Sequence, residues 1–362
     1  MLRNMTVYLM TVLMFLFPSL NISDIHPDPS AWKTDYPYVY VHGLHGWGSY
    51  DLQNRFLPYW GMFGGDMIKN LNSLGFTCRS ASVDPEGSAW DRACELYAQL
   101  SGTRVDYGKA HSEKFGHDRY GKDFAKDRLI DAWSAQDKIN LLGHSFGGVT
   151  VRLLAELMAN GSAEERGATD AAELSALFTG GKADWVYSVT TLAAPTNGTT
   201  AYGFGDPDKE LETADCAAYD MYIDNALALN ETISVQSCTY YFAIPCSTTV
   251  PAQDGTHVPD PKLTERQELV SAENLGRLTG VTPKGFVVDA SWLENDGLVN
   301  TISAGAPFGA PSVKLDRTNI RPGVWNVAET HRGDHMSLIG DLWKTKNIRP
   351  LYADWMEMIN SL

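Results

Sequence analysis

Basic residues, cysteines and long apolar segments are all scarce in this chain of 362 residues. The 29 Lys and Arg are outnumbered by 44 Asp and Glu, which gives a formal net charge of −15. No Lys/Arg cluster is dense enough for a nucleic-acid footprint, so we exclude nucleic acid as a partner. The acidity also disfavours strong attraction to anionic bilayers. Internal repeats and long linkers are absent as well, which favours a single domain over residues 24–362.

An apolar run from Met5 to Leu20 follows a single positive charge at Arg3. This pattern is typical of a secretory signal peptide, and we assign residues 1–23 to it. The run is short for a membrane span, which leaves an uncleaved signal anchor as the less favoured alternative. No other segment is long and apolar enough to cross a bilayer, so we expect a secreted, extracellular protein without a transmembrane partner.

The five cysteines are an odd number, so at least one thiol is expected to stay unpaired. Disulfides are allowed if the chain is exported. Cys238 and Cys246 flank the strand-like run 239–244, and a bridge between them would close a small loop. Cys94 lies within an apolar helical pattern and is expected to be a buried structural thiol.

Strand-like and helical patterns alternate along the chain. Helices are expected at 65–74 and 148–158, and strands at 36–41, 76–83, 138–142, 185–192 and 285–289. This alternation predicts an α/β fold with a mostly parallel sheet and helices on both faces. Active sites of such sheets lie at the carboxyl ends of the strands. Residues 84–124 are rich in polar, aromatic and histidine residues, and we expect them to form an insertion between core elements.

The strand at 138–142 runs directly into Gly143-His144-Ser145-Phe146-Gly147, and a helical pattern follows. Strand, sharp turn and helix form the context in which G-x-S-x-G is a nucleophile elbow. The turn holds the serine in a strained backbone conformation. The flanking glycines avoid a Cβ that would collide with the neighbouring strand and helix. We therefore predict that Ser145 is a catalytic nucleophile.

A serine nucleophile needs a base, usually a histidine, and in α/β-hydrolases the chain order is serine, acid, histidine. Three histidines follow the elbow: His257, His331 and His335. His257 lies in a polar, proline-rich stretch typical of a surface loop. His335 lies in a polar loop that enters an apolar helix near the C-terminus, so it is the preferred base, with His331 as the alternative.

The base must be oriented by a carboxylate, and the developing oxyanion needs two backbone N–H groups. Asp296 lies in a glycine-containing turn after a strand and is the preferred acid, with Asp289 as the alternative. Phe146 follows the nucleophile and supplies one N–H group. The glycine-rich loop 42–48, after the first strand, is the natural source of the other, which we assign to Leu44.

Several segments spread over the chain carry a family resemblance. They are residues 42–48, 90–100, 105–111, 116–121, 143–148, 292–303, 323–326 and the pair Asp334-His335. From about residue 38 to the C-terminus, the chain resembles the zinc-containing true lipases of the thermoalkalophilic Bacillus/Geobacillus type and their staphylococcal relatives. The resemblance implies an α/β-hydrolase fold, and the family's nucleophile, acid and base fall on Ser145, Asp296 and His335.

The same resemblance implies a zinc-binding insertion at about 84–124. Taken alone, two nearby histidines with an upstream aspartate are weak evidence for a metal. The family's zinc ligands fall on four residues here: Asp91, His111, His117 and Asp220. Asp215 and Asp224 are the alternatives for the last ligand. Two imidazoles and two carboxylates suit tetrahedral Zn²⁺, and a closed set of four ligands is structural, not catalytic.

Two departures from the family concern its lid and its calcium site. The family carries a long, largely helical lid, whereas only residues 199–220 join the corresponding segments here, and 205–210 are polar and turn-like. We therefore expect a shortened lid and a site that is open permanently, with weak interfacial activation. Ser337 and Leu342 replace a calcium-ligating glutamate and a proline, so calcium is not predicted.

The expected function is hydrolysis of carboxylic esters of lipids, of the triacylglycerol lipase type, through an acyl-enzyme. The substrate is a lipid or ester, met at an oil–water interface or a polyester surface. The alternative on the same triad is a lidless carboxylesterase or polyester hydrolase. Two other classes are a hydrolase-fold binding protein without turnover and a hydrolase whose catalytic centre is the metal cluster.

Overall fold

A computed structural model describes residues 25–340 and 347–362. The predicted signal segment 1–23 and Leu342 therefore lie outside the described residues. A seven-stranded sheet forms the centre of the molecule, in the order β13-β14-β7-β6-β5-β1-β2, and every neighbouring pair is parallel. The strands are β1 (Tyr38–Val41), β2 (Cys78–Ala81), β5 (Ile139–His144), β6 (Val186–Leu192), β7 (Tyr240–Ile244), β13 (Ser312–Lys314) and β14 (Trp325–Val327).

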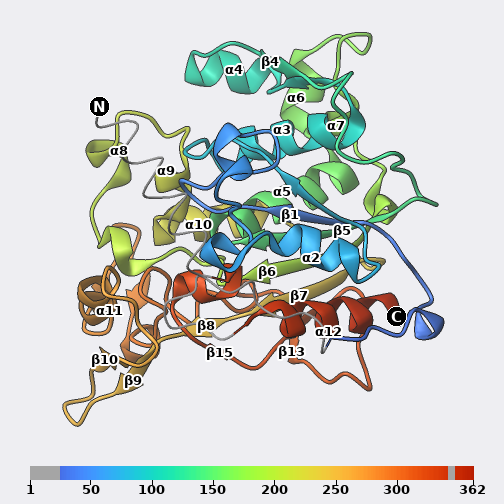
Figure 1. Cartoon of the computed structure of the whole chain (residues 1–362). Helices are drawn as coiled ribbons and strands as arrows, with labels where there is room; N and C mark the ends of the chain where they lie inside the picture. Colours follow the sequence, from blue (N-terminus) through green and yellow to red (C-terminus); the bar gives the residue numbers. More distant parts are fainter. Residues whose placement is uncertain (1–24, 341–346) are drawn as a thin grey trace, which may run out of the picture.

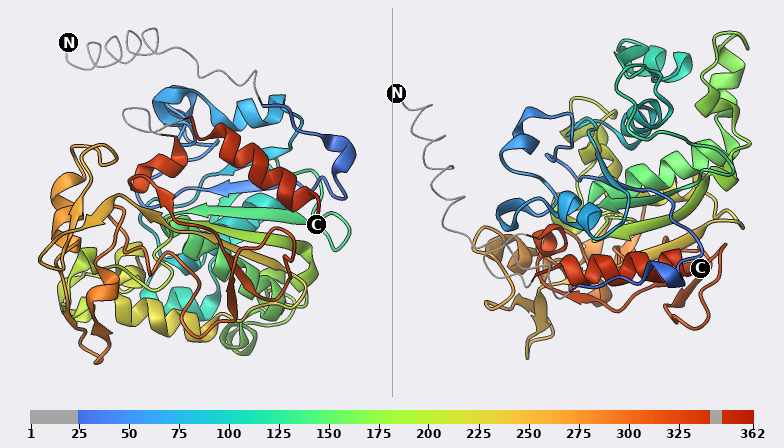
Figure 2. Two further views of the ribbon diagram at one scale, coloured as in Figure 1. Left: turned by 90° about the horizontal axis from the view of Figure 1, so that it is seen from below. Right: turned by 45° about the vertical axis from the view of Figure 1, so that its right-hand side comes forward.

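Helices cover both faces of this sheet (Figures 1 and 2). Alternate residues of a strand point to opposite faces, and in β1 the valines Val39 and Val41 pack against α3 (Ala89–Ser101) and α5 (Phe146–Asn160). Tyr38 and Tyr40 pack on the other face against the remaining two core helices, α2 (Met67–Ser73) and α12 (Arg349–Asn360). The predicted α/β fold with a parallel sheet covered on both faces is confirmed.

A small unit leaves the core above α3 (Figure 2, right). It consists of β3 (Arg104–Asp106), α4 (Lys109–Phe115) and β4 (Tyr120–Asp123), with α6 (Ala163–Ala168) and α7 (Ala176–Thr179) nearby. By contrast, α3 buries most of its length and belongs to the helix layer of the core. Within the expected insertion at 84–124, only the part after α3 therefore projects from the domain.

The remaining elements are short and mostly surround the carboxyl ends of the strands (Figure 1). The helices are α8 (Pro207–Glu210), α9 (Ala217–Met221), α10 (Ile223–Thr232) and α11 (Leu269–Leu275). The strands are β8 (Cys246–Ser247), β9 (Thr249–Pro251), β10 (His257–Pro259), β11 (Gly280–Val281), β12 (Val287–Val288) and β15 (His331–Arg332). The 3₁₀ helices are η1 (Pro29–Ala31), η2 (Leu52–Arg55), η3 (Met62–Gly64), η4 (Ala183–Trp185), η5 (Thr200–Tyr202), η6 (Ala290–Trp292) and η7 (His335–Ile339).

The structure corrects two expectations. Residues 285–289 do not form a core strand, because only β12 forms there and it pairs antiparallel with β11 outside the central sheet. The sheet is completed instead by β14 and β13, which the sequence analysis did not predict. Cys238 and Cys246 are both free, since the extended strand β7 separates them, whereas Cys94 is buried as expected.

No helix within residues 25–340 and 347–362 combines the length and the apolarity needed to cross a bilayer.

Candidate active site and metal centre

Ser145 lies in a sharp turn between β5 and α5, with φ 54° and ψ −131°. A positive φ is costly for a residue with a side chain and is a form of strain that concentrates at functional sites. A Cβ on Gly143 would lie 2.2 Å from the carbonyl oxygen of Gly147, and a Cβ on Gly147 would lie 2.3 Å from that of Val41. The predicted need for glycine at both positions is therefore confirmed.

His335 and Asp296 form a buried pair, although they come from distant loops. The His335 Nδ1 atom lies 2.8 Å from Asp296 Oδ2. The second carboxylate oxygen, Oδ1, accepts the N–H groups of Leu298 at 3.0 Å and Val299 at 2.8 Å. The backbone N–H of His335 also donates to the Asp296 carbonyl at 2.8 Å. Because the carboxylate accepts from Nδ1–H, the imidazole keeps its Nε2 lone pair for a proton.

Ser145 and His335 line one pocket of about 260 Å³ at the carboxyl ends of β1 and β5. The other lining residues are mostly apolar: Leu44, His45, Trp47, Tyr59, His144, Thr199, Ala201, Tyr202, Met221, Leu298, Val299 and Met336. The alternatives to the pair lie elsewhere. Asp289 is exposed and caps η6 by accepting from the N–H of Ser291. His331 lies in β15, where burial lowers its pKa.

Of the two residues predicted to supply an N–H group to the oxyanion, Leu44 lines this pocket and Phe146 directly follows Ser145, which also lines it. Phe146 is the first residue of α5, so its N–H has no acceptor within the helix. Leu44 follows β1 and lines the pocket. Its neighbour Gly43 packs so closely on the elbow that a Cβ there would lie 2.7 Å from Ser145 Cβ. The loop 42–48 and the turn at Ser145 are thus held against each other.

A buried hydrogen-bond chain, which no sequence pattern indicates, links the loop 42–48, Tyr59, His144 and the backbone of His335. The N–H of Gly43 donates to the Tyr59 hydroxyl at 3.1 Å, and this hydroxyl lies 2.7 Å from His144 Nδ1. The His144 Nε2 atom lies 2.9 Å from the carbonyl oxygen of His335. A carbonyl can only accept, so Nε2 carries the hydrogen and Nδ1 accepts from Tyr59. Burial lowers the pKa of His144 well below its usual value, which agrees with this neutral form.

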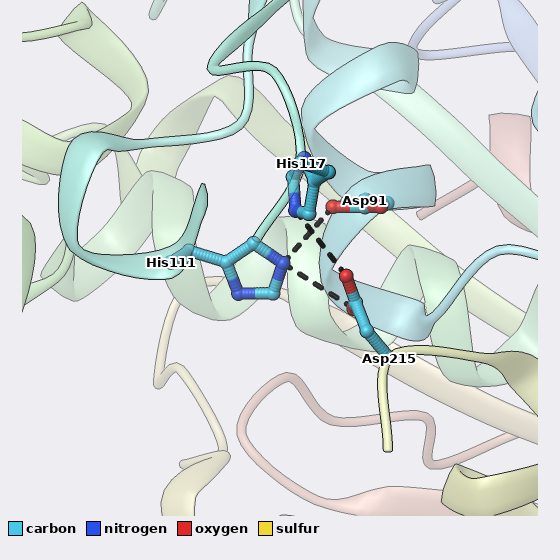
Figure 3. A group of neighbouring side chains, drawn as sticks. All are labelled: Asp91, His111, His117 and Asp215. Atoms are coloured by element: carbon cyan, nitrogen blue, oxygen red, sulfur yellow. Dashed lines mark ion pairs between the residues drawn. The ribbon is translucent and has the colours of Figure 1, made fainter. Parts of the chain in front are cut away.

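A second cluster joins Asp91, His111, His117 and Asp215 (Figure 3). The His111 Nε2 atom lies 3.1 Å from Asp91 Oδ1 and 3.3 Å from Asp215 Oδ1, and His117 Nε2 lies 3.3 Å from Asp215 Oδ2. One ligand atom from each residue lies within 4.8 Å of all the others. The cluster ties α3, α4 and the turn after α4 to the segment before α9.

The donor set fits a divalent cation. The His117 Nδ1 atom lies 2.9 Å from the carbonyl oxygen of Asp118, which fixes the hydrogen on Nδ1 and leaves the Nε2 lone pair facing the cluster. Burial by itself lowers the pKa of His111, but Asp215 and Asp91 outweigh it and raise this pKa to about 9. Two imidazole nitrogens and two carboxylates that converge in this way match the tetrahedral N₂O₂ sets that bind Zn²⁺.

The fourth member of this cluster is Asp215, in place of the predicted Asp220, and Asp215 was one of the two alternatives. Asp220 lies in the first turn of α9, and its Oδ2 accepts the N–H of Ala89 at 2.7 Å. Ala89 is the first residue of α3, so a carboxylate there stabilises the positive end of that helix. The other alternative, Asp224, bonds Thr282 and Lys284 and is not part of the cluster.

Comparison with known protein families gives a match over nearly all of the described chain. The family model described as "Lipase-like, C-terminal domain" matches residues 34–207 and 207–362.

Individual relatives and solved structures agree with this match. Lipase 2 of Staphylococcus aureus is 32% identical over 362 aligned residues, which cover 84% of this chain and 50% of that protein. The chain thus spans about half the length of the curated relatives it matches. The structure of Staphylococcus hyicus lipase gives a TM-score of 0.80 at 28% identity, covering 92% of this chain and 98% of that one. EstA from Clostridium botulinum gives a TM-score of 0.83 at 28% identity, covering 96% and 93%.

Proposed function

The chain belongs to the family described as lipase-like, C-terminal domain, and on that premise we propose that it hydrolyses carboxylic esters of lipids, as a lipase of the triacylglycerol type. One observation carries the proposal. A strained serine lines the same largely apolar pocket as His335, and the imidazole of His335 pairs with the buried carboxylate of Asp296. Relatives with the printed name lipase support the same class of reaction.

The reaction proceeds by two-step acyl transfer. His335 Nε2 takes the proton from Ser145 Oγ as this oxygen attacks the ester carbonyl carbon. The N–H groups of Leu44 and Phe146 stabilise the oxyanion of the tetrahedral intermediate. His335 then protonates the leaving alcohol, and water releases the carboxylic acid from the acyl-enzyme by the same steps. Asp296 holds the Nδ1–H tautomer throughout.

The pocket walls favour an acid with an apolar chain. Leu44, Leu298, Val299 and Met336 supply aliphatic surface around the serine. The segment after β6 adds Thr199, Ala201 and Tyr202 to the wall. These three residues belong to the short lid region 199–220, in which η5 and α8 are single turns. Burial of an acyl chain on these walls binds the substrate through the hydrophobic effect.

We assign a structural role to the metal cluster and include Asp215 as its fourth ligand. Bound Zn²⁺ would cross-link the projecting unit at 104–123 to α3 and to the segment before α9. The cluster shares no residue with the pocket at Ser145. The proposed organisation is a signal segment at 1–23 and a single secreted domain over 24–362.

Hydrolysis of p-nitrophenyl esters from acetate to palmitate tests this function. We expect Ser145→Ala to lose nearly all turnover and Ser80→Ala to keep it, because Ser80 Oγ is buried on β2 without a hydrogen-bond partner among the described residues. A rate maximum at octanoate or longer esters supports a lipase. A maximum at acetate or butyrate would favour the carboxylesterase alternative, and polyester films would then be the next substrate. Substantial turnover by Ser145→Ala would refute the assignment.

A further inference from the structure

A second pocket, of about 400 Å³, lies between α5, α10 and the ends of β7 and β14. Its lining residues are Arg152, Asn230, Ile233, Ser234, Val235, Tyr241, Pro307, Phe308, Gly309, Ala310, Pro311 and Trp325. None of them lines the pocket that contains Ser145. The volume falls in the range of small-molecule sites, and neither the proposed reaction nor the metal cluster uses this space.

Arg152 lies on α5 and is only 2% exposed. Its Nη2 donates to Asn230 Oδ1 at 2.7 Å, and its guanidinium carbon lies 5.8 Å from the centre of the Trp325 ring. The Nε and Nη1 atoms of Arg152 and the Nε1 atom of Trp325 are all buried, and none of them has a hydrogen-bond partner among the described residues. Burial lowers the pKa of Arg152 to about 10, so the guanidinium still carries its charge at neutral pH.

This charge has no acidic partner in the part of the chain that the structure describes. Across residues 25–340 and 347–362, no carboxylate forms an ion pair with Arg152. Glu156, one turn later on α5, accepts from the N–H and hydroxyl of Ser234 at 2.8 and 2.7 Å and from Asn160 at 2.7 Å. A buried charge is costly unless it is paired and hydrogen-bonded, so Arg152 is a donor group that lacks its acceptor.

The other two fully buried arginines differ from Arg152 in this respect. Arg92 donates to the carbonyl oxygens of Asp84 and Gly43 and to the Thr150 hydroxyl. Arg349 donates to the carbonyl oxygens of Gly64 and Gly65 and to the Asn70 side chain. Arg92 and Arg349 thus hold backbone segments together, and neither lines this pocket or the pocket at Ser145. Of the three arginines, only Arg152 both leaves buried guanidinium donors unused and lines this pocket.

We propose that this pocket binds a monocarboxylate with an apolar chain, whose carboxylate pairs with the Arg152 guanidinium. Four of the five guanidinium N–H groups are unused, which is enough for two parallel bonds to a carboxylate. Ile233, Val235 and Phe308 supply apolar wall for the chain. The site is separate from the hydrolytic pocket, and the inference does not depend on the proposed function.

Calorimetric titration of the full-length protein tests the site without any turnover. The probes are octanoate, acetate, octanol and inorganic phosphate. We expect octanoate to bind about tenfold or more tightly than the other three, because only octanoate offers both the charge and the chain. Arg152→Lys keeps the charge but loses the planar fork, and should weaken octanoate binding about tenfold or more.

Two further variants locate the binding. Ala310→Phe fills the pocket without changing Arg152 and should also abolish octanoate binding, which covers the case that Arg152→Lys fails to fold. Leu298→Trp narrows the pocket at Ser145 and should leave octanoate binding intact. Loss of binding in Leu298→Trp, or unchanged binding in Ala310→Phe, would place octanoate in the hydrolytic pocket and overturn the proposal. Phosphate binding as tight as octanoate, or no binding by any probe, would overturn it as well.

Discussion

Replacement of Tyr59 by phenylalanine tests whether the buried hydrogen-bond chain holds the catalytic parts together. The change keeps the ring and removes only the hydroxyl, which accepts from Gly43 N–H and donates to His144 Nδ1. The N–H group of Gly43 and the Nδ1 atom of His144 are both buried away from water, so in Tyr59→Phe each loses its hydrogen-bond partner. An unsatisfied buried polar group costs about 1 to 3 kcal/mol. Two such groups are created, and rearrangement of the neighbouring residues recovers part of the cost. We therefore expect the free energy of unfolding to fall by about 2 to 4 kcal/mol.

The activity should fall together with the stability. Gly43 precedes the proposed oxyanion donor, and His144 bonds the backbone of His335. A shift of either part misaligns the reacting groups, so we expect kcat to fall about tenfold to a hundredfold.

Tyr40→Phe is the matched control, because Tyr40 is also buried but its hydroxyl meets only weak sulfur partners among the described residues, Met356 Sδ at 3.5 Å and the Cys78 thiol. Urea unfolding and ester hydrolysis, both at 25 °C, measure the two effects. We expect the control to lose less than about 1 kcal/mol and no activity. If Tyr59→Phe matched the control in both assays, the chain of bonds would have no positioning role and this reasoning would be refuted.

Four further predictions concern the proposed triad, the proposed metal site and the proposed short lid. In Asp296→Asn the amide oxygen keeps the two backbone N–H bonds, so the NH₂ group faces His335 Nδ1 and imposes the wrong tautomer; kcat should fall about 10³- to 10⁴-fold at an unchanged melting temperature. Asp215→Asn should lose zinc in elemental analysis, whereas Asp220→Asn should retain it. In the metal-free protein the pKa of His111 is raised from 6.5 to about 9. The protonated imidazole therefore stabilises the fold fully below pH 6.5, and this contribution to the free energy of unfolding is lost as the pH rises through 9. The melting temperature of His111→Gln should lack this decline. Hydrolysis of tributyrin should rise smoothly through its solubility limit, and a jump there would contradict a short lid.

The sequence predicted the parts of the fold that have strong local patterns. The strands β1, β5 and β6 are almost entirely buried because both faces of the sheet are covered, and the elbow at Ser145 follows β5. The short strands β13 and β14 have three residues each, too few for a pattern. The path of the long segment after β7 brings these two strands to the edge of the sheet, and hydrophobic periodicity does not predict that path.

The fourth residue of the metal cluster could not be chosen from the sequence either, because two aspartates precede α10. Asp215 and Asp220 have the same chemistry, and only the start of α9 at Ala217 decides which side chain faces the histidines. Tyr59 offered no signal, because its partners Gly43 and His144 are distant in sequence. Arg152 did offer one: it is the single charged residue in the run 146–155 of an otherwise apolar helix pattern.

Labelling of the full-length protein with a fluorophosphonate, followed by peptide mapping, tests the central claim most directly. The reagent reacts with a serine oxygen only when a neighbouring base activates it. We predict one adduct, on the peptide that contains Ser145, and its loss in both Ser145→Ala and His335→Ala. An unlabelled wild-type protein that still hydrolyses esters, or an adduct on another serine, would contradict the account.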